Sequence, residues 1–181
     1  MTEVVWPDEI VKALVVRQRL DELDSVPVWS YPLPHVAVDE EGLQVTERSL
    51  GMPLDPQYRG FLRHADGWPK FYQDVDLFGT RELLSGPEHD SAKETLDVLD
   101  GAGSLARVGL TKDSLLPIAA SALQTDLFVM ADRGGEHAHV LWLAGDLVEE
   151  FPSFSEYFLA MLDYERRQIV YFETGQWPAT E

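Results

Sequence analysis

A helix start, a helix stop and the start of a strand follow one another within residues 47–79, and this order constrains the fold more than any other part of the chain. The Asp-Pro pair at 55–56 predicts the helix start, because aspartate accepts hydrogen bonds from free backbone N–H groups and proline suits the first helical position. The Asp-Gly pair at 66–67 predicts the helix end. The apolar period then shortens to two, which indicates a half-buried strand over residues 74–78.

The helix predicted within this stretch has one apolar face. Its apolar side chains recur at a spacing of three and four residues, which places them on one side of a helix. Trp68 follows the turn directly and is expected to fold back onto that face. The residues of the face are Tyr58, Phe61, Leu62 and Ala65.

This stretch resembles the SUKH superfamily, and within it the Smi/Knr domain, which is named for fungal regulators of cell-wall synthesis and is abundant in bacteria. The resemblance is clearest over residues 38–80 and looser as far as about residue 172. The chain has Asp-Pro and Asp-Gly where the family usually has Leu-Pro and Asn-Gly, and both changes keep the local helix-start and turn chemistry. The residues that carry it are Glu47, Leu50, Gly51, Pro56, Tyr58, Phe61, Leu62, Asp66 and Gly67, followed by Trp68 and a Leu-Phe-Gly-Thr strand end.

The resemblance implies a function as well as a fold. Many bacterial members of the family are immunity proteins of polymorphic toxin systems, so it implies a non-enzymatic domain that binds a toxin. The fungal members imply an alternative, an intracellular scaffold or regulator with endogenous partners. The residues listed above are expected to be mainly structural.

The charge of the chain points to the same kind of partner. Its 14 basic and 32 acidic residues give a formal net charge of −18. Nucleic-acid binding is therefore not expected, because phosphates would be repelled. A basic protein, such as a nuclease-type toxin domain, is the partner that this charge favours, although an acidic surface that only maintains solubility explains it equally well.

The expected compartment is the cytoplasm, without membrane association. The chain has no cysteine, which fits a reducing environment. Residues 1–3 are not basic and acidic residues interrupt the apolar ones that follow, so no signal sequence is predicted. No apolar run has the length of a membrane span. The sequence makes no prediction of the oligomeric state.

We divide the chain into residues 1–35, an N-terminal helix and proline-rich linker, residues 36–175, the Smi/Knr-like domain, and residues 176–181, a tail. The N-terminal helix starts near Trp6, ends near Leu23 and is expected to bury one apolar face. The residues of that face are Ile10, Val11, Leu14, Val15 and Leu20.

Within the domain, a helix starts at residues 39–41 and is closed by Gly51, and an acidic insertion occupies about residues 86–113. Ser153 with Glu156 has the spacing of a capping box and predicts a long final helix that ends at Gly175. Four segments with turns between them read as strands in antiparallel hairpins. These strands are 116–119, 126–131, 139–143 and 147–151. The predicted fold is α+β: a mixed, mostly antiparallel sheet of five or six strands, with helices packed against it and an extra N-terminal helix.

The predicted partner-binding residues are Trp68, Tyr72, Asp74 and Asp76. Trp and Tyr are frequent interface anchors, and carboxylates beside them would suit a cationic protein surface. For Trp68 the alternative is that it caps the core. For Asp74 and Asp76 the alternatives are the solvated side of a strand or a pair of catalytic acids, and no histidine or nucleophile with matching spacing accompanies them.

His137 and His139 form the other candidate site. The spacing places two imidazoles on one strand face, which some metal sites use, and supports a third hypothesis, a metal-dependent or small-molecule-binding enzyme. A half-buried strand histidine with one hydrogen bond is the simpler interpretation. We predict no catalytic residue, no metal and no cofactor.

Overall fold

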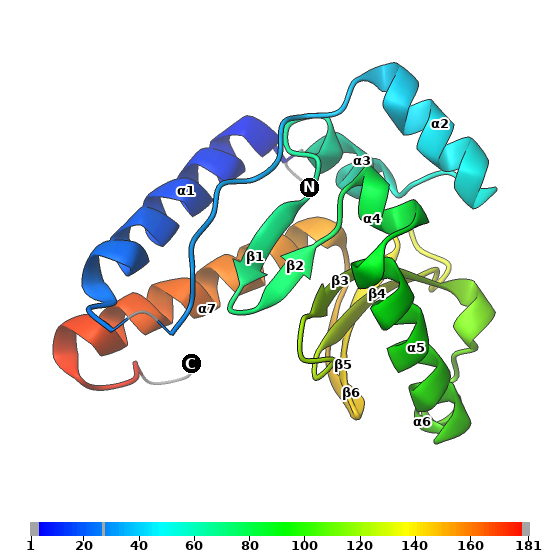
Figure 1. Cartoon of the computed structure of the whole chain (residues 1–181). Coiled ribbons are helices and arrows are strands. Elements are labelled where there is room, and N and C mark those ends of the chain that lie inside the picture. Colours follow the sequence, from blue (N-terminus) through cyan, green and yellow to red (C-terminus); the bar gives the residue numbers. More distant parts are fainter. Residues whose placement is uncertain (1–3, 27, 179–181) are drawn as a thin grey trace.

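Six strands form one sheet in the order β1-β2-β3-β4-β5-β6, and every neighbouring pair is antiparallel. The structure is a computed structural model that describes residues 4–26 and 28–178 (Figure 1). The predicted α+β class is confirmed, and the sheet is antiparallel throughout rather than mixed. The strands are β1 Trp68–Tyr72, β2 Val75–Leu77, β3 Leu115–Ser121, β4 Leu127–Ala131, β5 His139–Ala144 and β6 Asp146–Phe151.

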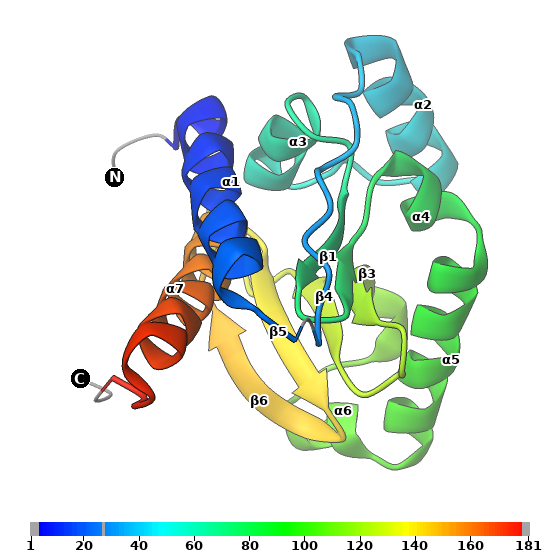
Figure 2. The same cartoon turned by 60° about the vertical axis from the view of Figure 1, so that its left-hand side comes forward.

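Helices cover the sheet from two sides. Figure 2 shows α1 and α7 side by side on one side, and α5 and α6 on the other. None of the described helices is both long and apolar enough to cross a membrane. The helices are α1 Trp6–Leu23, α2 Glu40–Leu50, α3 Pro56–Leu62, α4 Thr80–Leu84, α5 Pro87–Gly101, α6 Ser104–Arg107 and α7 Phe154–Thr174, with the short 3-10 helix η1 Lys112–Ser114 before β3.

An aromatic cluster joins α1, α3 and α7 on one side of the sheet. The Trp6 ring lies 5.7 Å from Phe61 of α3 and 5.4 Å from Phe158 of α7, measured between ring centroids. A Cβ atom at position 60 would lie 2.9 Å from the Trp6 indole nitrogen, so Gly60 lets the tryptophan pack directly onto α3. The N-terminal helix is thus part of the core and not a separate arm.

The predicted helix ends are confirmed where a side chain or a glycine fixes them. Asp39 accepts a hydrogen bond from the Gly42 N–H, and Ser153 accepts one from the Glu156 N–H, as expected of N-terminal caps. Gly51 closes α2 in the left-handed conformation, with φ of 71°. Gly175 closes α7 with φ of 72°.

The central stretch differs from the prediction in two ways. Helix α3 ends at Leu62 and not at the Asp-Gly pair. Trp68–Tyr72 is a strand paired with β2, whereas the sequence predicted that the strand region begins only at residue 74. Gly67 supplies the turn before this strand with φ of 84°, and a Cβ atom there would lie 2.5 Å from the backbone nitrogen of Gly79. The turn is therefore held against the end of β2, which lets β1 begin directly after it.

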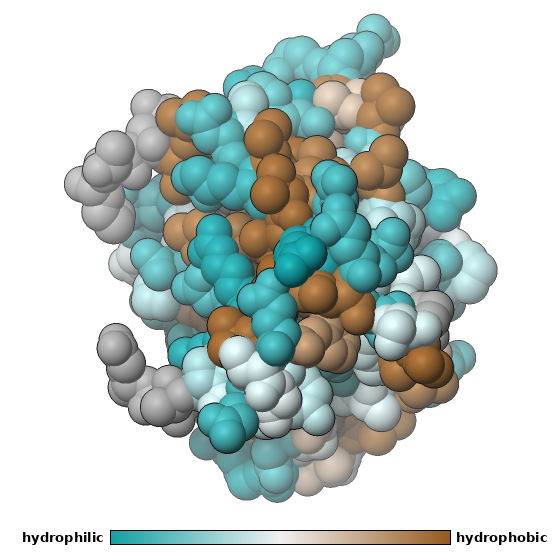
Figure 3. All heavy atoms as spheres, turned by 90° about the vertical axis from the view of Figure 1, so that its left-hand side faces the viewer, coloured by the Kyte–Doolittle hydropathy of each residue, from teal (hydrophilic) through white to brown (hydrophobic). Residues whose placement is uncertain are grey.

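The predicted inner face of α1 is wrong in part. Val11 and Val15 are 57% and 63% exposed, whereas Ala13 and Arg17 are buried. Figure 3, which faces the side formed by α1 and α7, shows apolar surface between hydrophilic groups. The helix is rotated from the expected orientation because a buried arginine takes a place that the apolar pattern assigned to valine.

The acidic insertion is a covering layer of the sheet. Helix α5 lies against β3 and β4 and buries Ala92, Leu96 and Leu99, which recur at helical spacing. Four of its acidic residues, Asp90, Glu94, Asp97 and Asp100, are exposed, and Glu88 is half-buried. Residues 1–3, on which the absence of a signal sequence was argued, lie outside the described residues, as do Pro27 of the linker and residues 179–181 of the tail.

Candidate protein-binding surface

Trp68, the first residue predicted to bind a partner, is fully buried. Its indole N–H donates to the carbonyl of Pro32 in the linker at 2.9 Å. The guanidinium carbon of Arg17 lies 5.4 Å from the centroid of its ring. Trp68 therefore presents no surface to a partner in the folded chain, and its aromatic area holds the linker and α1 against β1.

Arg17 closes the outer edge of β1. Its guanidinium donates to the carbonyls of Lys70 and Phe71, both at 2.7 Å, and to the carboxylate of Glu165 on α7 at 2.6 Å. Burial lowers the pKa of Arg17 and raises that of Glu165 to about 7, and the attraction between the two groups opposes both shifts. An edge strand with free carbonyls is a template for unwanted pairing, and here an arginine from α1 occupies it.

Tyr72 and the two aspartates do not form the single patch that was predicted. Tyr72 lies at the end of β1 on the side of α7, with its ring centroid 6.0 Å from that of Tyr164. Asp76 lines a hollow on the other side of the hairpin, beside Glu88 of α5. Its carboxylate accepts the backbone N–H of Lys70 at 2.8 Å, so it stabilises the hairpin. One Asp74 oxygen is buried without a hydrogen-bond partner among the described residues.

Tyr72 instead belongs to an aromatic surface that the fold assembles from distant segments. Its ring centroid lies 6.2 Å from that of Trp142 on β5, and the Trp142 and Tyr164 centroids lie 6.4 Å apart. All three side chains are half-buried. Asp126 accepts the Trp142 indole N–H at 2.7 Å, and Glu149 accepts the Tyr164 hydroxyl at 2.7 Å. We call these five residues the aromatic–carboxylate surface.

Burial, with a smaller contribution from neighbouring carboxylates, raises the pKa values of both tyrosines of this surface. Burial raises the pKa of Tyr72, and Asp126 and Glu165 add to the shift. Burial also raises the pKa of Tyr164 to about 12, with a further contribution from its hydrogen bond to Glu149. Both hydroxyl groups are therefore hydrogen-bond donors at neutral pH, beside carboxylates that attract cations.

A hollow of about 370 Å³ borders the aromatic–carboxylate surface. The Arg167 guanidinium carbon lies 5.8 Å from the ring centroid of Tyr164. Trp177, in the predicted tail, stacks on Tyr171 with ring centroids 4.6 Å apart. The residues that line the hollow are Trp29, Tyr72, Gln73, Tyr164, Arg167, Gln168 and Trp177.

The two histidines do not converge on one site. His139 lies 2.7 Å from Glu150, which also pairs with Arg133. His137 precedes β5, and its Nδ1 lies 3.6 Å from Asp55. Across residues 4–26 and 28–178, no group of three or more histidine, aspartate or glutamate side chains is arranged to hold a metal ion.

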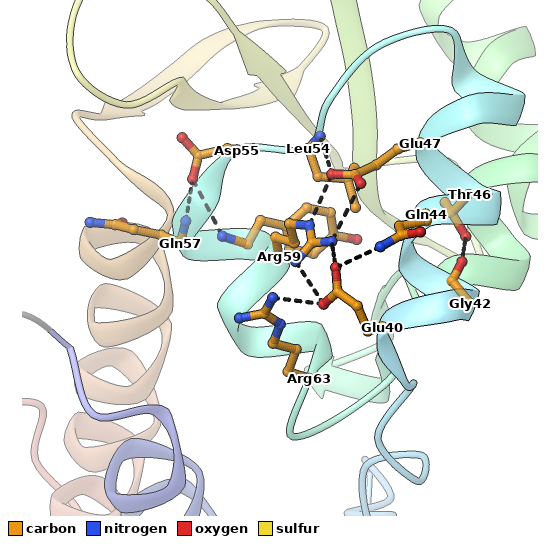
Figure 4. Close-up of polar contacts among 11 residues, drawn as sticks. Glu40, Gly42, Gln44, Thr46, Glu47, Leu54, Asp55, Gln57, Arg59 and Arg63 are labelled. Atoms are coloured by element: carbon orange, nitrogen blue, oxygen red, sulfur yellow. Dashed lines mark hydrogen bonds and ion pairs between the residues drawn. The ribbon is translucent and has the colours of Figure 1, made fainter.

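The motif residue Glu47 connects two helices. It accepts hydrogen bonds from the Leu54 backbone N–H at 3.2 Å and from the Arg59 guanidinium at 3.0 Å (Figure 4). Arg59 also pairs with Glu40 at 2.5 Å, and Arg63 pairs with Glu40 at 2.7 Å. Hydrogen bonds from Arg59 and Arg63 lower the pKa of Glu40 to about 2, and the carboxylates raise the pKa of Arg59.

The other motif residues also have structural contacts. The Tyr58 hydroxyl donates to the carbonyl of Phe78 at 2.6 Å. Asp66 accepts hydrogen bonds from the backbone N–H and the hydroxyl of Thr80, at 2.7 and 2.8 Å. Phe61 and Leu62 are fully buried. These contacts give the motif residues a structural role.

Trp142, Tyr164, Asp126 and Glu149 are the members of the surface that the sequence did not identify. Trp142 lies on β5 and Tyr164 on α7, whereas Asp126 precedes β4 and Glu149 lies on β6. No local spacing in the sequence links these four positions. The available signal was the aromatic residue at position 142, on the strand face opposite His139, Leu141 and Leu143.

The protein is an α+β domain whose sequence motif has a structural role. Three half-buried aromatic side chains, Tyr72, Trp142 and Tyr164, form part of its surface. A comparison with protein-family models finds the SMI1 / KNR4 family (SUKH-1) over residues 37–160. The match covers more than half of the chain, and the chain belongs to this family. A comparison with curated proteins found no match. Helix α1 and residues 161–174 of α7 lie outside the matched residues.

Proposed function

We propose that this chain is a non-enzymatic protein-binding domain of the immunity type, which neutralises a basic, nuclease-type toxin domain by occluding it. The observation that carries the proposal is the aromatic–carboxylate surface on a member of a family in which many bacterial proteins have this role. Half-buried Tyr and Trp side chains supply contact area at a low cost in conformational entropy. The carboxylates at their polar ends supply charge complementarity to a cationic partner.

The charge of the chain affects the rate at which it would encounter such a partner. A formal net charge of −18 accelerates encounter with a basic protein and disfavours wrong partners more than it strengthens the final complex. The proposed location is the cytoplasm, with no cofactor and no association with nucleic acid or membranes. A stoichiometric amount of zinc or manganese in the purified protein would contradict the non-enzymatic assignment.

A second candidate is a scaffold or regulator with endogenous partners. The observation that favours it is α1, which lies outside the family match and exposes Val11 and Val15. Exposed valines one helical turn apart form a stripe that a second helix could cover. In this case the partner would contact α1 and not the aromatic–carboxylate surface.

The first experiment is capture on the tagged chain from a lysate of its own cells, at low and at high salt, with identification of bound proteins by mass spectrometry. The proposal expects one basic, toxin-like polypeptide whose association slows as salt rises. That polypeptide, expressed in a sensitive host, should be lethal alone and tolerated together with this chain. Recovery of regulatory or envelope-synthesis proteins alone would favour the second candidate.

Two charge-reversal variants then test whether the aromatic–carboxylate surface is the one that binds the toxin. Glu149→Lys reverses a charge in the aromatic–carboxylate surface, and Glu94→Lys makes the same change on the exposed side of α5. Protection against the identified toxin should fall with Glu149→Lys and persist with Glu94→Lys, with both variants folded by circular dichroism. Equal protection by both variants would contradict the assignment of this surface.

A further inference from the structure

Another hollow, distinct from those beside Asp76 and Tyr164, lies at the end of β4 that is opposite the aromatic–carboxylate surface. Asp126 precedes β4 and belongs to that surface, whereas Asp132 follows β4 and lines this hollow. Its volume is about 420 Å³. The loop before α3, the start of β3, the end of β4 and the loop before β5 enclose it. We call it the acid-rimmed pocket.

The floor of the acid-rimmed pocket is apolar. Leu54 and Met130 lie there and are each 4% exposed. Leu115 and Leu116 of β3 are only half-buried, although they belong to a strand inside the sheet. Met52, at the mouth, is 48% exposed. Half-buried leucines in a concave site are the usual receptor for an apolar group.

The rim of the pocket carries carboxylates. Asp113, Asp132 and Glu136 line it and are exposed, and Asp55 lies deeper, with its side chain 4% exposed. The described lining residues include no lysine or arginine, and His137 is the one basic side chain among them. In a low-dielectric hollow with this lining, a cation gains electrostatic energy and an anion is repelled.

The pocket has a fixed frame. One Asp55 oxygen accepts the backbone N–H groups of Gln57 and Tyr58 at the start of α3. The other accepts the backbone N–H of Ala138 at 3.0 Å and lies 3.6 Å from His137 Nδ1, which is buried without a hydrogen-bond partner among the described residues. A single carboxylate thus joins two walls, so little ordering is required when the pocket is filled.

A separate hollow of about 390 Å³, which we call the far hollow, adjoins the acid-rimmed pocket beside α5. The two hollows share Asp113, Leu115 and Leu116. The far hollow carries both charges, because Lys93 and Lys112 line it together with Asp97 and Asp113, and Lys112 pairs with Asp97 at 2.7 Å. The groove formed by two adjoining hollows of this volume exceeds what one small organic cation fills, and it suits an extended segment of polypeptide.

A second copy of this chain is a poor occupant, because it would bring a further formal net charge of −18 to a rim of carboxylates. Lysine and arginine side chains combine the two properties that the pocket requires, an aliphatic stem and a cationic head. We propose that the acid-rimmed pocket receives a lysine or arginine side chain of a polypeptide partner, whose flanking apolar residues lie along the groove. This inference deepens the proposed function and rests on it only in that the partner is a basic polypeptide.

The test uses three tripeptides that differ in one side chain, acetyl-Leu-Lys-Leu-amide, acetyl-Leu-norleucine-Leu-amide and acetyl-Leu-Glu-Leu-amide, with hexylammonium as a small cation. Each is titrated into the ¹⁵N-labelled full chain and followed by the amide shifts of Leu54, Met130 and Ala138. The lysine peptide should give saturating shifts there and also at Leu96 of the far hollow. It should bind about threefold to tenfold more tightly than the norleucine peptide, the factor expected for one or two partly exposed ion pairs.

A pair of matched variants assigns the effect to the rim. Asp132→Asn with Glu136→Gln removes two rim charges, and asparagine can still accept the Gly134 backbone N–H that Asp132 accepts. Asp21→Asn with Glu156→Gln removes two charges from exposed positions of α1 and α7. The first variant should reduce the preference for the lysine peptide, because Asp113 is the one exposed carboxylate left among the described lining residues, and the second variant should keep the preference.

Three results would overturn the proposal. The first is equal binding of the lysine and glutamate peptides, and the second is an unchanged preference in the rim variant. The third is saturating shifts with hexylammonium and none with the lysine peptide, which would assign the pocket to a small organic cation. These titrations use the chain alone, so their failure leaves the toxin-protection result unaffected, and failure of protection leaves them unaffected.

Discussion

Two groups of ion pairs hold helices together in this protein, one buried and one at the surface. Arg17 of α1 meets Glu165 of α7 at 2.6 Å, with 3% and 5% of the two side chains exposed. Arg59 of α3 meets Glu40 of α2 at 2.5 Å, with 18% and 51% exposed. The distances are nearly equal, so geometry alone does not separate the two pairs.

The difference lies in what surrounds each pair. Water solvates Glu40 whether or not it meets Arg59, so little is gained by the contact. Arg17 and Glu165 have lost their water, and each depends on the other and on the carbonyls of β1. The buried pair joins two residues, Arg17 and Glu165, that lie outside the family match. This contact is the one whose loss leaves a charge buried without a partner.

The largest effect is expected from Arg17→Ala. It leaves Glu165 buried without its partner and the carbonyls of Lys70 and Phe71 without a donor, so the free energy of unfolding should fall by about 3 to 5 kcal/mol. Chemical denaturation of the variant measures this loss. Arg19→Ala is the matched control, because Arg19 is on the same helix and pairs with Glu173 at the surface. Similar losses in both variants would show that burial does not decide how much an ion pair contributes to the free energy of unfolding.

The double variant Arg17→Met with Glu165→Met sharpens this result. It removes both charges and keeps apolar volume, so it should be more stable than Arg17→Ala. The β1 carbonyls still lack their donor, and we expect about 1 to 3 kcal/mol of the loss to persist. Full recovery of stability would show that closing the edge of β1 contributes nothing.

Glu165 should also give the protein an unusual dependence on pH. Its folded pKa of about 7 is above the ordinary value of 4.5, so the folded state binds more protons than the unfolded state between these values. Its contribution to stability is therefore present below pH 4.5 and is lost as pH rises to about 7. Denaturation midpoints of the wild type and Glu165→Gln across this range measure the effect. An identical slope in both proteins would contradict it.

A smaller effect is expected from Glu47→Ala. The change removes the acceptor of the Leu54 N–H and one partner of Arg59, both in a partly buried position. The free energy of unfolding should fall by about 1 to 2 kcal/mol. Glu41→Ala, an exposed change on the same helix, is the control, and equal losses would contradict a structural role for Glu47.

The smallest effect is expected from Glu40→Gln, because the carboxylate is exposed and salt screens its contacts. Its folded pKa of about 2 is below the ordinary 4.5, so its contribution is present above pH 4.5 and is lost as pH falls toward 2. The slope thus has the opposite sign to that of Glu165. Acid titration at low and high salt measures it, and an effect independent of salt would contradict the assignment.

The predictions that succeeded come from local chemistry. Asp39, Asp55 and Ser153 cap helices as expected, and Gly51 and Gly175 close them. The four later strands were also predicted correctly. Each of these features depends on residues a few positions apart, so the sequence carries the whole signal.

The predictions that failed depended on contacts between distant segments. Apolar spacing assigned Val11 and Val15 to the inner face of α1, but the charged Arg17 lies there because Glu165 and the β1 carbonyls are its partners. Contacts with distant segments also separate Tyr72 from Asp76. Tyr72 lies beside α7 and Asp76 lies beside α5, on opposite sides of the hairpin.

The sequence by itself determined the class of fold, the family and the order of most elements, because capping and periodicity act within a few residues. Only the tertiary structure decided which residues form the two candidate sites. Tyr72, Trp142 and Tyr164 meet because antiparallel pairing and the path of α7 bring them together. Asp55 and Ala138 meet for the same reason across the acid-rimmed pocket. Long-range packing carries no local signature, and in this protein the proposed binding chemistry depends on it.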